Sequence, residues 1–325
     1  MASTNASTLV TSTAIQFINK YHQVDWIVAT SVNAVSIFLL TWMSFSLLFY
    51  GIHHGKWRSG DSNSSTKASA GLVYTFATAA QFLGFIRVFS DLATYNYGYA
   101  TNTQTGCQDA HQMGTAGYII TLSFIYLFLW LRQRTLYKHP ILNALYKNWV
   151  RIISWTSIGV ILIGLLVSGI LYLASNHYTY TANGCNILFL GVPTQWPAYL
   201  ASAVTTFGQI LMLILFAYPM SFQANRHSAD RMIGLLKRSA LMALICTITD
   251  LTATINLAFL ARPTTHLAVM LFEINVVVNL VAVYLSFETW DQIMLTPFKA
   301  WWRPADTKKT VPSSSEGATA NTDAV

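Results

Sequence analysis

Charged residues are almost absent from seven long stretches of this 325-residue chain. Only 10% of all residues are charged and 54% are hydrophobic, whereas an ordinary globular domain has about 25% charged residues. Each stretch holds roughly 20 mostly apolar residues, the length that a helix needs to cross a bilayer. A helix also satisfies its own backbone hydrogen bonds in lipid. The sequence therefore predicts an all-α membrane protein, a bundle of seven transmembrane helices at residues 26–49, 69–93, 112–131, 152–174, 196–219, 239–261 and 266–287.

The basic residues lie almost entirely on one side of the predicted bundle. Of the 19 Lys and Arg residues, sixteen fall in the first, third and fifth connections and in the C-terminal tail. The opposite side has only Lys20 and Arg262, and Arg87 lies within a span. Because Lys and Arg accumulate on the cytoplasmic side, the N-terminus is predicted outside and the C-terminus inside. The net charge of +7 then reflects topology, and we expect a multi-pass plasma-membrane protein with no nucleic-acid partner.

Four regions follow from this topology. Residues 1–24 are predicted to form an extracellular N-terminal segment, and residues 25–287 the seven-helix domain. Residues 288–304 mix aromatic and basic side chains, as in an amphipathic helix that lies on the inner surface of the bilayer. Residues 305–325, rich in Ser, Thr and Ala, are predicted to be disordered. Asn5 begins an Asn-x-Ser sequence in the outer segment and is a candidate for N-glycosylation.

Two of the three cysteines fall on the predicted outer side. Cys107 precedes the third apolar stretch, and Cys185 lies between the fourth and fifth stretches. Cysteines that face an oxidising compartment can pair, so we expect a disulfide between Cys107 and Cys185, with two free surface thiols as the alternative. Cys246, inside the sixth stretch, is expected to be a buried free thiol.

Ionisable side chains inside the predicted spans are candidate functional residues, because they are costly to place in lipid. The outer half of the bundle has the candidate ligand-binding residues Arg87, Asp91, Asp109, His111 and Glu273. Arg87 and Asp91 are four residues apart and can pair on one helix face. The alternative is that such groups hold the helices together and bind nothing.

With these features the chain resembles the G-protein-coupled receptor superfamily. The resemblance covers the seven-helix topology and the cysteine at the outer end of the third helix, Cys107. Arg132 matches the arginine of the Asp-Arg-Tyr motif at the cytoplasmic end of that helix, and Trp155 matches a tryptophan of the fourth helix. Asn279 and Tyr284 are similar to the Asn-Pro-x-x-Tyr motif, without the proline and with one more residue between them.

The resemblance implies a receptor that senses an extracellular small molecule or peptide and signals to a cytoplasmic partner, a heterotrimeric G protein in this superfamily. Arg132, Asn279 and Tyr284 are then candidate switch residues, together with Asp250 near the middle of the sixth stretch. Leu131 stands where the family has an acidic residue. A retinal-binding opsin is not expected, because no lysine occurs between Arg238 and Phe298.

Two other classes of function remain open from the sequence. Asp250 and Glu273 could line the path of a proton or cation in a channel or transporter. An intramembrane metal hydrolase would need three convergent ligands, and His111, His177 and His266 lack a paired spacing such as His-x-x-x-His. We therefore expect no metal, no cofactor and no enzymatic activity.

Overall fold

A computed structural model describes residues 4–55, 65–101, 104–137, 147–175, 177–181, 184–188, 196–223, 230–260 and 265–302 of the chain. Side chains are described for most of these residues, but not for the start of α1, the two strands and several other helix ends. In chain order the elements are α1 (Thr4–His53), α2 (Ser65–Thr101), α3 (Gln104–Tyr137), α5 (Asn148–Ser175), β1 (His177–Thr181), β2 (Gly184–Leu188), α6 (Trp196–Gln223), α7 (Asp230–Leu260), α8 (Thr265–Leu285) and α9 (Trp290–Trp302).

Several of these helices are long and apolar enough to cross a membrane, as predicted. Within the described residues, four stretches qualify alone and a fifth qualifies if the bent pair α8–α9 counts as one span. The apolar part of α6 is shorter, and α7 is not among the candidates. The chain is therefore a multi-pass membrane protein, while the count of seven spans stays a prediction. The four stretches are Ile27–His53, Gly71–Leu92, His111–Tyr137 and Asn148–Ala174.

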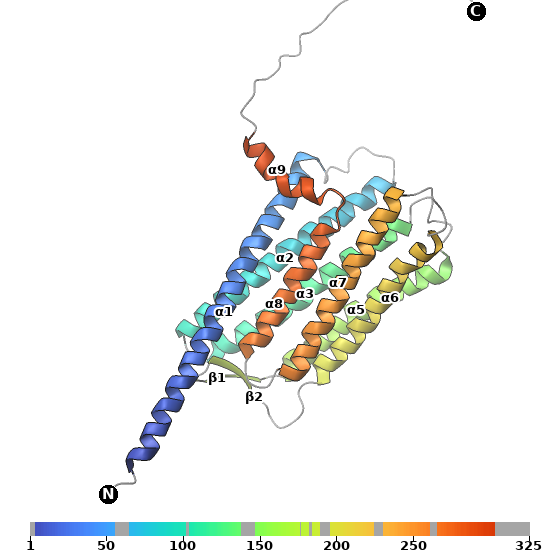
Figure 1. Ribbon diagram of the computed structural model, residues 1–325. Coiled ribbons are helices and arrows are strands. Elements are labelled where there is room, and N and C mark those ends of the chain that lie inside the picture. The colour runs from blue at the N-terminus through green and yellow to red at the C-terminus, as the bar shows by residue number, and fades with distance from the viewer. Residues whose placement is uncertain are drawn as a thin grey trace, which may run out of the picture.

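The helices lie side by side in one bundle (Figure 1), and their contacts close it into a ring that α3 crosses. Each of the seven long helices from α1 to α8 packs against its neighbour in the chain, and α8 closes the ring against α1. Among the described helices α3 has the most partners, because it touches α6, α7 and α8 as well as α2 and α5, while α2 also touches α8. Polar side chains on the inner face of α3 can therefore meet partners from most of the bundle.

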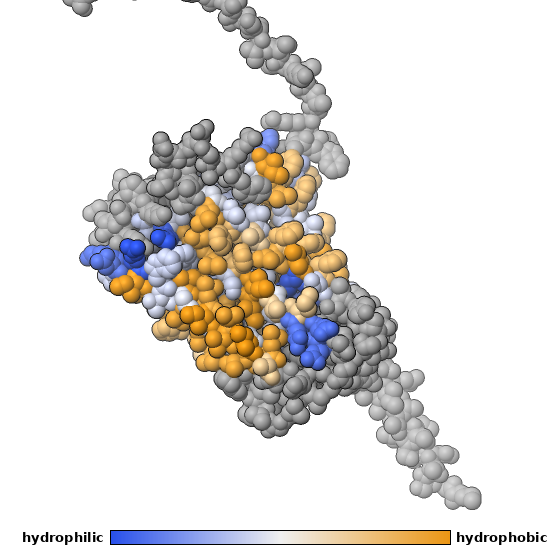
Figure 2. Space-filling model, turned by 180° about the vertical axis from the view of Figure 1, so that it is seen from behind, coloured by the Kyte–Doolittle hydropathy of each residue, from blue (hydrophilic) through white to orange (hydrophobic). Residues whose placement is uncertain are grey.

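Large apolar side chains cover the outside of the bundle. Phe38 is 76% exposed, and Phe82 and Ile163 are also exposed. Contact between such apolar side chains and water would cost free energy. Figure 2 shows one such face, where apolar side chains form a broad belt with hydrophilic side chains on either side of it. The pattern is typical of a surface in contact with lipid.

The short helix α9 turns sharply away from the last long helix. The axes of residues 270–285 and 290–298 differ by 96°, and α9 lies across α1. Ile293 is buried in a cluster with Leu47 and Tyr284, and Phe298 packs on Trp42 with a centroid distance of 4.8 Å. The predicted helix after residue 287 is thus present, and its position at the inner membrane surface stays a prediction.

Two features of the fold differ from the sequence analysis. Residues 1–24 stay predicted as an extracellular segment before the first span, but their helical structure was not foreseen, because α1 begins at Thr4 and runs without interruption to His53. The physical reason is that the first 50 residues contain neither Gly nor Pro, the two residues that most disfavour a helix. The loop with Cys185 also contains an unpredicted antiparallel hairpin, β1–β2, in which Cys185 is opposite Tyr180. Its first strand lies against α3.

Candidate functional site

The buried carboxylate of Asp250 is the centre of a polar cluster in the middle of the bundle. Its Oδ1 accepts hydrogen bonds from the side-chain amides of Asn275 at 2.7 Å and Asn279 at 2.8 Å. Its Oδ2 accepts from the Gln209 amide at 2.5 Å and from the Tyr126 hydroxyl. Both oxygens of the carboxylate are therefore occupied by donors from other helices.

These contacts join four helices, since the donors come from α3, α6 and α8 and the carboxylate from α7. Thr249 extends the cluster by donating to the Asn279 side-chain oxygen at 2.8 Å, and Asn275 also donates to the Tyr118 hydroxyl at 3.1 Å. The four donors to Asp250 named above are all neutral groups. A carboxylate with both oxygens bonded in this way holds helices together, and a motion of α7 must break several bonds at once.

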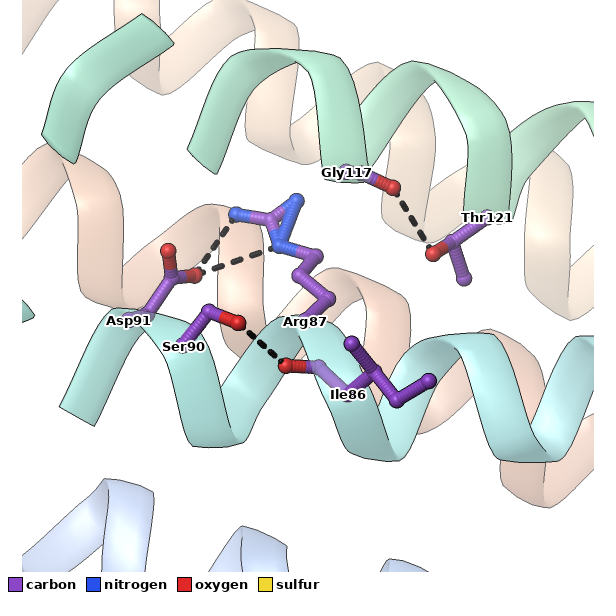
Figure 3. A network of polar contacts seen from close by, with 6 residues as sticks. All are labelled: Ile86, Arg87, Ser90, Asp91, Gly117 and Thr121. Atoms are coloured by element: carbon purple, nitrogen blue, oxygen red, sulfur yellow. Dashed lines mark hydrogen bonds and ion pairs between the residues drawn. The ribbon is translucent and has the colours of Figure 1, made fainter. Parts of the chain in front are cut away.

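A second polar cluster lies nearer to the predicted outer side, between α2 and α3. Arg87 and Asp91 form the expected ion pair, with Nε and Nη2 of the guanidinium 3.2 and 3.1 Å from Oδ2 of the carboxylate (Figure 3). The guanidinium also lies over the Tyr118 ring, 4.8 Å from its centroid. Glycines on α3 make room for this pair, because a Cβ atom at Gly114 would be only 2.9 Å from Oδ1 of Asp91. A Cβ atom at Gly117 would contact the aliphatic part of Arg87.

Glu273 of α8 also belongs to the outer cluster. It is 0% exposed, and its carboxyl oxygens lie close to the side chains of Asn33 and Asp91 without the geometry of a full hydrogen bond among the described residues. Asn33, Arg87 and Asp91 are its polar neighbours. Both polar side-chain atoms of Asn33 and Nη1 of Arg87 also lack partners in the described structure. Two acidic groups and one guanidinium thus share a buried space with unused hydrogen-bonding capacity.

Arg132 forms a third buried site at the opposite end of α3. Its Nε donates to the Ser239 hydroxyl on α7 at 2.7 Å, and its Nη1 donates to the Ser286 hydroxyl at 2.9 Å. Its Nη2 donates to the backbone carbonyl of Ser286, just after α8. The Phe287 ring lies 6.0 Å away. The guanidinium therefore connects α3 to α7 and to the end of α8 through neutral acceptors.

The remaining predicted residues are not brought into these clusters by the described contacts. Asp109 is exposed and His111 is partly buried near the start of α3. Tyr284 is buried beside α1 and α9, and its hydroxyl lacks a hydrogen-bond partner among the described residues. The side chains of Cys107, Cys185, Asn5, His177 and His266 lie outside the described part, so the disulfide and the glycosylation stay predictions. Cys246 is a buried free thiol, as expected.

Five important partners were not singled out from the sequence. They are Tyr126, Gln209, Asn33, Ser239 and Ser286. The amides of Gln209 and Asn33 could have been found, because an uncharged amide inside an apolar stretch needs an interhelical partner. The two serines could not, because serine often bonds to the carbonyl of its own helix and is common in these stretches.

Within the described residues, no group of three or more His, Cys, Asp or Glu side chains could hold a metal ion. Comparison with known proteins finds no matching protein-family model and no matching curated protein. Any functional assignment therefore rests on the membrane fold and on the three polar clusters.

Proposed function

We propose that this protein is a membrane receptor, similar in design to G-protein-coupled receptors, with seven spans and an extracellular N-terminus. The observation that carries the proposal is the set of hydrogen bonds from Arg132 to Ser239 and Ser286. They connect the central helix to α7 and to the end of α8 at the end of the bundle that is rich in basic residues. A change in these few contacts can alter the surface that a cytoplasmic partner would bind.

The chemistry of this connection suits a two-state switch. Arg132 is bound to hydroxyls and a carbonyl, and Leu131 precedes it where an acidic partner stands in the family. Hydrogen bonds from a charged donor to neutral acceptors each contribute about 1.5–3 kcal/mol. A ligand that favours the separated state by a similar amount could therefore shift the equilibrium. The cluster around Asp250 would transmit the movement, because it joins the same helices.

The proposed ligand site is the outer cluster of Arg87, Asp91 and Glu273, with Asp109 and His111 nearer to the outer surface. Glu273 and Asn33 have buried polar atoms without partners in the described structure. Such atoms are costly to leave unbonded, so a ligand that bonds to them gains affinity. Two acidic groups against one guanidinium favour a cationic or polar ligand.

The proposal is tested by basal signalling of a Ser239 variant in cells that carry sensors for each class of heterotrimeric G protein. Ser239→Ala removes one acceptor from Arg132, so we expect basal activation to rise roughly tenfold, since about 1.5 kcal/mol corresponds to that factor. Ser239→Thr, which keeps the hydroxyl, is the matched control. Equal basal activity for wild type and Ser239→Ala, in cells where Arg132→Ala also has no effect, would contradict the proposal.

Conduction of protons or cations is a second candidate, favoured by the unbonded carboxyl of Glu273. A conducting protein would give a membrane current, and Glu273→Gln would reduce that current. The cluster around Asp250 argues against a continuous path, because its oxygens are bonded to protein donors. Current recordings of wild type, Glu273→Gln and Asp250→Asn separate the two functions, since a receptor gives no current in any of them.

A further inference from the structure

We propose that the surface between α3 and α5, at the end of the bundle rich in basic residues, is a binding site for an anionic phospholipid. The structure places a cation over two adjoining indole rings there. The Arg134 guanidinium lies 5.4 Å from the centroid of Trp130 and 5.3 Å from that of Trp155. The two rings are themselves in edge contact at 4.6 Å. This inference does not depend on the receptor function.

Hydrogen bonds inside the bundle fix the position of Trp130. Trp130 is buried, and its Nε1 donates to the Ser154 hydroxyl at 3.0 Å. That hydroxyl in turn donates to the Gln133 side-chain oxygen at 3.2 Å. Because the indole is fixed by these bonds, the Arg134 side chain that lies on it is ordered before any ligand binds. A pre-ordered cation loses less conformational entropy on binding.

Two more cations extend this surface along α5. Lys147, Arg151 and Trp155 are spaced four residues apart, so they share one helix face. The Arg151 backbone N–H donates to the Lys147 carbonyl at 3.2 Å, which places Lys147 in the same helical turn geometry. Both Lys147 and Arg151 are exposed. The positive end of the α5 dipole adds to their charge.

No acidic residue is near these cations in the sequence. No Asp or Glu occurs between Asp109 and Asp230, a stretch that contains the end of α3 and all of α5. The ion pair Arg87–Asp91 belongs to α2 and lies beside Gly114 and Gly117, far along α3 from Arg134. The surface therefore has a net positive charge that an external anion can neutralise.

The apolar side chains beside these cations identify the anion as a lipid. Trp155 is 49% exposed and Ile152 is 65% exposed, on the outer face of the bundle. Arg134 and Arg151 each lie three residues inside an end of a candidate span, which is where headgroups begin and where long basic side chains extend to them. A phospholipid can satisfy both parts at once, with its phosphate on the cations and its acyl chain along Trp155 and Ile152.

The test is native mass spectrometry of the purified full-length chain in detergent, titrated with phosphatidylserine or with phosphatidylcholine of the same acyl chains. We expect the first phosphatidylserine to bind about tenfold more tightly than the first phosphatidylcholine, and Arg134→Gln or Arg151→Gln to weaken it about fivefold each. Arg134→Lys, which keeps the charge but cannot stack as a planar group, should recover only part of the loss. Lys237→Gln is the matched control, because Lys237 is an exposed cation of α7.

Four results would overturn the proposal. Equal affinity for the two lipids would show that the charge of the headgroup does not contribute to binding. An equal loss in Lys237→Gln would show general attraction to a basic surface. Tight binding of glycerophosphoserine, which has the headgroup without acyl chains, or displacement of the lipid by an acidic peptide would assign the surface to a soluble anion or to a protein.

Discussion

At the scale of single residues, the two buried carboxyl groups of the bundle differ in their hydrogen bonding. Asp250 accepts four hydrogen bonds from protein donors, whereas the oxygens of Glu273 accept none among the described residues. Replacing each carboxyl by its amide is the same chemical change at both positions. Its effect on stability should nevertheless have opposite signs, which separates a group that joins helices from a group that is available to a ligand.

Asp250→Asn should destabilise the protein. One carboxylate oxygen becomes an NH₂ group that faces two donors, so hydrogen bonds to α3 and α6 or to α8 are lost. We expect a loss of about 3 kcal/mol or more in the free energy of unfolding, because each hydrogen bond to a charged group contributes about 1.5–3 kcal/mol. The measurement is the thermal unfolding temperature in detergent. An unchanged unfolding temperature would mean that the cluster around Asp250 contributes nothing to the bundle.

Glu273→Gln should leave the unfolding temperature unchanged or raise it, by up to about 1 kcal/mol in free energy. The amide removes an acidic group that lies beside Asp91 and has no hydrogen-bond partner in the described structure. The same variant should lose binding or signalling if this cluster takes a ligand. A destabilisation equal to that of Asp250→Asn would show instead that Glu273 holds the helices together.

The ionisable members of these sites could be predicted from the sequence, but which side chains bond to which could not. Arg87 and Asp91 were found because an i,i+4 pair is visible in one helix. Asp250 was found because a carboxyl in an apolar stretch is unusual. Its donors Tyr126 and Gln209 come from helices distant in the sequence. Only the packing of the ring decides which side chains face Asp250.

At the scale of the helices, close packing of α5 against α6 depends on glycines. A Cβ atom at Gly164 would collide with Val204, and one at Gly208 would collide with Ile161. Gly208→Ala should therefore lower stability by about 1–3 kcal/mol, measured as a lower unfolding temperature. Gly159→Ala is the matched control on α5, because no atom lies within 4 Å of its added Cβ. An equal change in the unfolding temperature of both variants would mean that α5 and α6 do not pack this closely.

The predicted disulfide between Cys107 and Cys185 would connect the hairpin to α3. The first strand of the hairpin lies against α3, and Cys185 is in the second strand. We expect peptide mass spectrometry without reduction to find one cross-linked peptide that contains both cysteines. The Cys246→Ser variant should give the same peptide, since Cys246 is buried. Recovery of Cys107 and Cys185 as free thiols would reject the disulfide.

At the scale of the whole molecule, the ring and its central helix explain why three separate polar clusters can act together. The cluster around Asp250 and the contacts of Arg132 both join α3 to α7, while the outer cluster lies between α2, α3 and α8. The apolar stretches predicted the helices and their order along the chain. They could not predict the order of the helices in space, because nearly all of them are apolar on every side. The long start of α1 was also missed, since polar residues there concealed an unbroken helix.

The central claim is that Arg132 holds α3 and α7 together through Ser239, and that losing this contact releases α7. The most direct measurement is the distance distribution between spin labels at Ile152 on α5 and Lys237 on α7, both exposed positions, by double electron–electron resonance. In the purified protein we expect one main distance for wild type and Ser239→Thr, and a second, longer distance in Ser239→Ala. Identical distributions in all three proteins would contradict the claim.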